Sequence, residues 1–281
     1  MIFMKKFLTF LFIAFFAAPV FSKSAEYTLE DISDGLAAKE FTAYLQPVYS
    51  VYEGKITEAE VLSRWNKGGK IIPPGAYIPV LEKSELIKDF DLYMLALACS
   101  YVKQIEKSSG MAVPLAVNFS RYTLSQPGIV EEMSDISEAF GVDRSLIGIE
   151  ITESFDLTSR KEAAAALAAL KKKGFVTYID DYGAGYTKLS DLKLFAPDIL
   201  KLDKSFLPKD ERLAEVSAES ICKITKRAHK AGMIVICEGV ETENQLDLLK
   251  KCGVDWVQGY LKSKPLPLKD FINKLKTDNK R

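Results

Sequence analysis

Residues 171–186 read KKKGFVTYIDDYGAGY, and this stretch decides the fold class. Its lysines end an Ala-rich amphipathic helical segment, and Gly174 supplies the turn that caps that helix. An apolar strand follows and runs directly into two adjacent carboxylates, Asp180 and Asp181. The same order of helix, glycine and apolar strand recurs twice nearer to the C-terminus. This alternation predicts a mainly parallel sheet covered by helices.

Strand-like and helix-like segments alternate from residue 26 onward. The strand segments are residues 44–51, 56–65, 114–120, 146–153, 175–181, 199–203, 233–240 and 256–261. The helical segments are residues 77–106 (as two helices), 129–140, 159–173, 207–231, 243–252 and 268–276. Eight such strands close a barrel, so we expect an α/β fold of the TIM-like (β/α)8 type. Residues 52–55 are too few for a parallel crossover, which predicts an antiparallel first strand pair.

Residues 1–25 have the pattern of an export signal. Two lysines, Lys5 and Lys6, precede an uncharged run at residues 7–22 that is rich in Phe, Leu and Ala. Because the run is shorter than a usual membrane span of about 20 residues, a cleaved signal peptide is favoured over a membrane anchor. If the run is retained, we expect it to associate with a membrane. Residues 26–281 then form one domain of barrel size.

The composition argues against a nucleic-acid polymer as partner. Lys and Arg together number 38, equal to Asp and Glu, so the chain has no bulk attraction for DNA or RNA. Any phosphate ligand must therefore be bound locally. The cysteines Cys99, Cys222, Cys237 and Cys252 are widely spaced and mostly lie in apolar or helical stretches. We expect buried free thiols rather than disulfides.

Polar residues cluster at the predicted carboxyl ends of the strands, where barrel enzymes place their active sites. In strand order they are Glu60 and Arg64, Asn118, Glu150 and Glu153, Asp180 and Asp181, Lys201 and Asp203, Glu238, and Gln258. Each alone has an ordinary explanation as a turn cap, an N-cap or a structural ion pair. Together, so many acids are costly to bury without a compensating cation. An oxygen-rich set without His or Cys suits Mg²⁺ or Mn²⁺ rather than zinc.

The motifs that carry these residues stand in the order of a known family. They are Glu60-Val61-Leu62-Ser63-Arg64-Trp65, Asn118-Phe119-Ser120, Glu150-Ile151-Thr152-Glu153, Asp180-Asp181-Tyr182-Gly183-Ala184-Gly185-Tyr186, Lys201-Leu202-Asp203, Glu238-Gly239-Val240-Glu241 and Gln258-Gly259-Tyr260. Over residues 30–275 the chain resembles the EAL-domain family of cyclic-di-GMP phosphodiesterases. Val61 departs from the family's signature triplet, which has alanine at that position.

The resemblance implies a two-metal phosphodiesterase that converts cyclic-di-GMP to linear pGpG. It implies that Glu60, Asn118, Glu150 and Asp180 hold one Mg²⁺ or Mn²⁺, and that Asp180 bridges to a second, held also by Asp181, with Glu238 nearby or ligating. The other implied roles are catalysis by Glu60, Lys201 and Glu238, substrate binding by Arg64 and Gln258, and loop support by Glu153 and Asp203. It also implies a homodimer formed around the fifth strand.

Other interpretations stay open. A catalytically inactive relative could bind cyclic-di-GMP or a protein, although such relatives lose metal ligands and none is missing here. Lys201 could form a Schiff base, but the surrounding acids would then lack a purpose. The compartment is open as well, because residues 1–25 indicate export while cyclic-di-GMP is an intracellular messenger.

Overall fold

The computed structural model describes residues 27–152, 160–183, 192–208 and 210–280. The export-signal pattern at residues 1–25 and the predicted supporting residue Glu153 therefore lie outside the described residues. Among the helices within those ranges, none is both long enough and apolar enough to cross a membrane.

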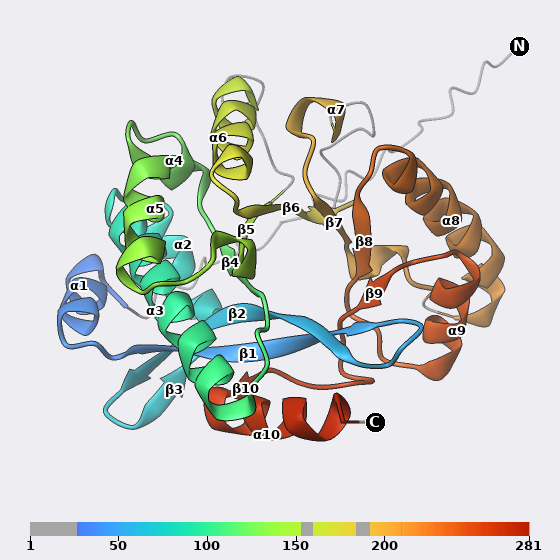
Figure 1. Ribbon diagram of the computed structural model, residues 1–281, viewed down its shortest axis with the longest axis horizontal. Coiled ribbons are helices and arrows are strands. Elements are labelled where there is room, and N and C mark those ends of the chain that lie inside the picture. Colours follow the sequence, from blue (N-terminus) through green and yellow to red (C-terminus); the bar gives the residue numbers. More distant parts are fainter. Residues whose placement is uncertain (1–26, 153–159, 184–191, 209, 281) are drawn as a thin grey trace, which may run out of the picture.

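Eight strands close the predicted TIM-like (β/α)8 barrel, which is confirmed (Figure 1). They are β1 (Phe41–Ser50), β2 (Ile56–Lys67), β4 (Leu115–Asn118), β5 (Ile147–Thr152), β6 (Val176–Tyr182), β7 (Ile199–Leu202), β8 (Ile234–Cys237) and β9 (Trp256–Val257). Hydrogen bonds link them in this order, and pairing of β9 with β1 closes the ring. β1 is antiparallel to both of its neighbours in the ring, as the short connection after it predicts, and the other pairs are parallel.

Two short strands extend the sheet beyond the barrel. β3 (Lys70–Ile72) forms a hairpin with β2, and β10 (Leu266–Pro267) pairs with β1. The predicted strand at residues 256–261 ends early, at Val257, because the chain turns sharply after it. The backbone N–H groups of Lys262 and Ser263 both donate to the carbonyl of Gly259.

Helices cover the outside of the barrel (Figure 1). They are α1 (Leu29–Ala37), α2 (Ile78–Leu81), α3 (Leu86–Ser109), α4 (Arg121–Leu124), α5 (Ile129–Ala139), α6 (Arg160–Lys172), α7 (Leu192–Phe195), α8 (Ala214–Lys230), α9 (Glu243–Lys251) and α10 (Leu268–Asp278), with 3-10 turns η1 (Pro74–Ala76), η2 (Arg144–Leu146), η3 (Lys204–Phe206) and η4 (Glu211–Leu213). In Figure 1, α3 to α5 lie on one side, α8 and α9 on the opposite side, and α10 beneath β1. The predicted helix at residues 207–231 is shorter than expected, since η4 precedes α8.

The barrel interior is apolar near the amino ends of the strands. Five buried residues form this layer: Val48, Ala116, Tyr178, Ile199 and Ile236. Successive side chains of a strand point to opposite faces, so residues two positions further along also point inward. For four of these strands that rule places a polar residue just above the apolar layer, toward the carboxyl ends.

The prediction of free thiols is wrong for two of the four cysteines. Cys222 on α8 and Cys252 at the end of α9 form a disulfide, with Cα atoms 4.3 Å apart. The two residues are 30 positions apart, and the packing of consecutive barrel helices brings them together. Spacing in the sequence does not reveal such a contact. Cys99 and Cys237 are free and buried, as predicted.

Candidate active site

Seven strands contribute one polar side chain each to a cluster at the carboxyl end of the barrel. They are Glu60 from β2, Asn118 from β4, Glu150 from β5, Asp180 from β6, Lys201 from β7, Glu238 directly after β8, and Gln258 directly after β9. The structure therefore brings together side chains that are almost 200 residues apart in the chain. Their common position follows from the inward alternation of each strand.

Lys201 lies at the centre of the cluster, and only 1% of its side chain is exposed. Its Nζ lies 2.6 Å from Glu238 Oε1, 3.1 Å from Asp180 Oδ1 and 3.5 Å from Glu60 Oε2. It also donates a hydrogen bond of 3.2 Å to Glu150 Oε2. Four carboxylates thus surround one ammonium, which leaves an excess of negative charge in a poorly solvated place.

This imbalance shifts the pKa values of the cluster. Burial raises the pKa of Glu150 well above its usual value and that of Glu238 to about 8, since Lys201 offsets only part of the cost. Burial also acts to raise the pKa of Glu60, but Lys201 and the amides of Gln258 and Asn118 outweigh it and hold that pKa low. Burial lowers the pKa of Lys201, yet the four acids raise it well above its usual value. The ammonium therefore stays charged, while protons or added cations must balance the acids.

Two amides fix the orientation of Glu60. Asn118 Nδ2 donates to Glu60 Oε1 at 3.0 Å, and Gln258 Nε2 donates to Oε2 at 2.7 Å. Gln258 Oε1 is buried without a hydrogen bond from any described residue, and the only described partner of the buried Glu150 Oε1 is Lys201 Nζ, an ion pair of 3.2 Å. Unpaired buried oxygens are costly. Amide and carboxylate oxygens gathered in this way are the ligands that hard divalent cations prefer.

The backbone near the end of β6 points a second acid toward the cluster. Asp181 has φ of +55°, an uncommon conformation for a residue with a side chain, and its N–H donates to Asp180 Oδ1 at 2.9 Å. Carboxylate oxygens of Asp180, Asp181 and Glu238 lie within 4.8 Å of one another. Burial, with the charge of Asp180, raises the pKa of Asp181 to about 6. These three acids could hold a cation of their own.

Two predicted site residues lie outside the cluster. The guanidinium of Arg64 donates to the carbonyl of Ser63 at 2.8 Å and lies over the ring of Tyr44, at 5.1 Å from its centroid. Asp203 caps η3 by accepting from the N–H of Ser205 at 2.8 Å. Neither contact reaches the acids around Lys201.

A cavity of about 760 Å³ lies beside the cluster, between β2, α3 and α4. Asn118 belongs both to this cavity and to the cluster, and Leu62, Phe90 and Arg121 line other parts of it. Its volume is within the range of small-molecule sites.

Sequence reasoning missed one buried polar pair below the cluster. Tyr178 donates its hydroxyl hydrogen to Glu58 Oε2 at 2.6 Å, and both side chains are buried. Burial raises the pKa of Glu58 to about 7 and that of Tyr178 well above its usual value. The signal was present, because Glu58 and Glu60 share one face of the same strand.

Comparison with known proteins places this geometry in context. Residues 29–265 match the EAL domain family. The chain is 32% identical to the cyclic di-GMP phosphodiesterase PdeL of Escherichia coli, across 88% of this chain and 68% of the relative. It is 29% identical to the cyclic di-GMP phosphodiesterase NbdA of Pseudomonas aeruginosa, but spans only 30% of that protein. The solved structure of the PaMucR phosphodiesterase in complex with c-di-GMP superimposes with a TM-score of 0.78, at 27% identity, over 86% of this chain and 98% of that one.

Proposed function

The chain belongs to the EAL-domain family, and we propose that it is a cation-dependent phosphodiesterase that hydrolyses cyclic-di-GMP to linear pGpG. One observation carries the proposal: four acids, one lysine and two amides from seven strands converge at the carboxyl end of the barrel. The names of its relatives support the substrate, since PdeL and NbdA are cyclic di-GMP phosphodiesterases and PaMucR was solved with c-di-GMP.

We assign two cation sites to the acids. Glu60, Asn118, Glu150 and Asp180 hold the first, and Asp180, Asp181 and Glu238 hold the second. The donor set fits Mg²⁺ or Mn²⁺, because every assigned ligand offers oxygen and none is His or Cys. When bound, the two ions lower the pKa of a water and neutralise charge on the reacting phosphate.

The protein's own groups then have distinct tasks. Lys201 keeps its proton, so it stabilises negative charge that develops on the phosphate rather than acting as a base. Glu238 is placed to accept a proton from the attacking water, since its side chain is 20% exposed and lies at the open end of the cluster. The side-chain amides of Asn118 and Gln258 hold the Glu60 carboxylate in place. Gln258 therefore orients a cation ligand in addition to its proposed role in substrate binding.

The rim of the barrel supplies substrate binding. Arg64 presents its planar guanidinium at the end of β2, suited to a phosphate or a guanine. The cavity beside Asn118 can receive part of the nucleotide. Asp203 and Glu153 support the loops around the site. A homodimer, and an N-terminal segment at residues 1–25 that acts as signal or anchor, complete the proposed organisation.

Turnover by the purified protein tests the proposal. Cyclic-di-GMP is incubated with the protein and either Mg²⁺ or Mn²⁺, and the products are separated by liquid chromatography. We expect pGpG from the unmodified chain, no product with a chelator, and folded but inactive Glu60→Ala and Asp180→Asn variants. Hydrolysis at an unchanged rate by either variant would contradict the assigned site. Binding of cyclic-di-GMP without any turnover would instead identify a binding module.

A further inference from the structure

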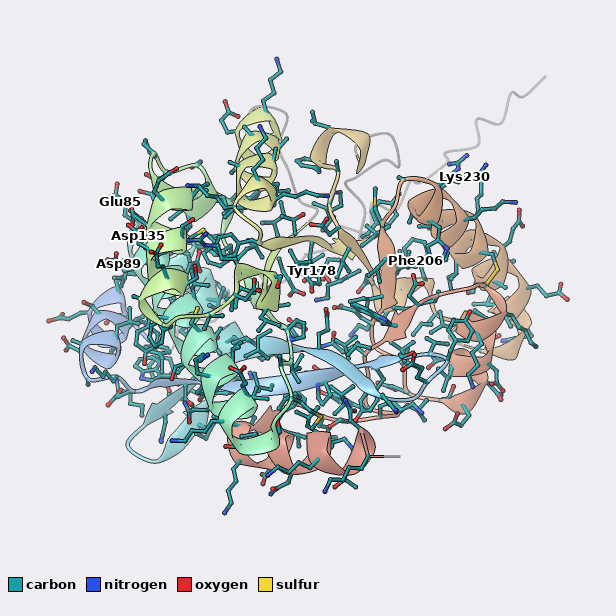
Figure 2. The ribbon with its side chains drawn as sticks, viewed as in Figure 1. Glu85, Asp89, Asp135, Tyr178, Phe206 and Lys230 are labelled. Carbon is teal, nitrogen blue, oxygen red and sulfur yellow. A yellow bond between two sulfur atoms is a disulfide. The ribbon has the colours of Figure 1, made fainter. Side chains whose placement is uncertain are left out.

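A hydrogen bond crosses the inside of the barrel directly below the acids. Tyr178 on β6 reaches Glu58 on β2, and its hydroxyl lies 2.6 Å from Glu58 Oε2. Tyr178 is 1% exposed and Glu58 is 2% exposed. Figure 2 shows Tyr178 near the middle of the molecule, within the ring of strands.

The barrel is shaped around this tyrosine ring. A Cβ atom added to Gly148 would lie 2.5 Å from Cε2 of Tyr178 and 3.1 Å from Cα of Ala116. The tyrosine ring therefore occupies the space that a side chain at position 148 would need. The other members of this layer, such as Ile199 and Ile236, are apolar. A buried hydroxyl in such surroundings needs a partner, and Glu58 supplies it.

The two strands that this bond joins do not pair with each other. β2 and β6 are separated in the sheet by β4 and β5, so backbone hydrogen bonds link them on this side only through three successive strand pairings. Lys201 also pairs with Glu60 and Asp180, but an ion pair lacks the fixed direction of the tyrosine hydrogen bond. Each strand carries an assigned cation ligand two residues beyond the bond: Glu60 follows Glu58, and Asp180 follows Tyr178. Two residues correspond to about 7 Å along a strand. The bond therefore holds the two strands together one layer below those ligands.

We propose that the Tyr178–Glu58 hydrogen bond is a positioning device that fixes the separation of Glu60 and Asp180 and so sets the affinity of the cation site. The proposal rests on the proposed function only for the assignment of the cation ligands. Neither residue touches the cation or the substrate. Both act through the strands that carry the ligands, as outer groups commonly orient metal ligands.

Binding of Mn²⁺ to the full chain tests the proposal without turnover. The free ion is counted by its electron paramagnetic resonance signal during titration. Tyr178→Phe keeps the ring and loses the hydroxyl, and we expect its Mn²⁺ dissociation constant to rise about tenfold, as for other groups that orient metal ligands. Glu58→Leu should have the same effect, and the double variant should be no worse than either single one. Glu58→Gln keeps an acceptor for the hydroxyl and should stay within about twofold of the unmodified chain.

A matched control separates positioning from stability. Tyr49 donates to Asp278 Oδ2 at 2.8 Å, a similar tyrosine–carboxylate bond that involves no assigned ligand. Tyr49→Phe should lower the melting temperature and leave Mn²⁺ affinity unchanged. An unchanged affinity in Tyr178→Phe, or equal losses in Glu58→Gln and Glu58→Leu, would overturn the positioning role alone. Failure of the unmodified chain to bind Mn²⁺ would overturn the proposed function together with it.

Discussion

Replacement of Lys201 by methionine tests the electrostatic balance of the cluster. Methionine fills a similar volume, so the substitution removes the ammonium with little change in packing. In the cation-free protein it leaves Glu60, Glu150, Asp180 and Glu238 without the partner that pairs with all four. We expect Lys201→Met to unfold more easily than the unmodified chain.

The structure sets the size of the effect. Lys201 is 1% exposed and each ion pair is shorter than 4 Å, so the loss is that of a broken buried pair, about 3–5 kcal/mol in the free energy of unfolding. The loss should be smaller at pH 6 than at pH 9. The pKa of Glu238 is about 8 and that of Glu150 is also raised, so these acids take up protons as the pH falls and need no counter-charge.

Divalent cations should restore the variant. An ion that binds only the folded chain, at one hundred times its dissociation constant, adds about 2.7 kcal/mol. Mn²⁺ should stabilise Lys201→Met more than the unmodified chain, since the ion no longer competes with Lys201 for the carboxylates.

Urea denaturation with a chelator and with Mn²⁺ measures both effects. Lys103→Met is the control, because Lys103 pairs with Glu106 on the surface at 3.0 Å and its loss should cost at most about 0.5 kcal/mol. A loss below about 1 kcal/mol for Lys201→Met with chelator, or no gain from Mn²⁺, would refute the reasoning.

Three further substitutions test the fold around the site. Cys252→Ser removes the disulfide to Cys222, which closes a loop of 30 residues. In urea denaturation its free energy of unfolding should be about 3–4 kcal/mol below that of the unmodified chain under oxidising conditions, and equal to it after reduction. Equal free energies for the two proteins under oxidising conditions would contradict the disulfide. Burial raises the pKa of Asp91 to about 7, so the folded chain binds this proton more tightly than the unfolded chain, and the free energy of unfolding falls as the pH rises from about 4 to 7. At pH 8 we expect Asp91→Asn to be more stable than the unmodified chain by about 2 kcal/mol. The same pH dependence of stability in both proteins would contradict this. Gly259→Ala would place a Cβ 2.1 Å from the carbonyl oxygen of Val240 and should lower the free energy of unfolding by about 3 kcal/mol. Gly75→Ala is the control, because its Cβ would meet no neighbouring atom within 4 Å and should have little effect.

Much of the fold could be predicted because the signals are local. Gly174 and Gly232 follow helices with φ of +96° and +80°, so these two helix-to-strand junctions were marked by a glycine. The antiparallel start followed from a connection too short for any other arrangement. α1 was missed although Thr28 and Asp31 form a capping box, because that signal is short and the helix has only nine residues.

The chemistry of the cluster was harder to predict than its members. Strand alternation indicates that Glu60 and Asp180 point inward, but not that Lys201 pairs with every acid or that Asn118 and Gln258 both bind Glu60. The disulfide and the Tyr178–Glu58 bond join elements through the packed structure, which no local pattern encodes. For Arg64 the sequence motif predicted a site residue, but in the structure its side chain contacts Ser63 and Tyr44 rather than the acids.

An anomalous-scattering map from crystals grown with Mn²⁺ tests most directly whether the strand-end acids hold cations. We predict strong peaks enclosed by Glu60, Asn118, Glu150 and Asp180, and beside Asp181 and Glu238, with Lys201 displaced from at least one carboxylate. A map with no peak at this end of the barrel, and Lys201 still paired with all four acids, would contradict it.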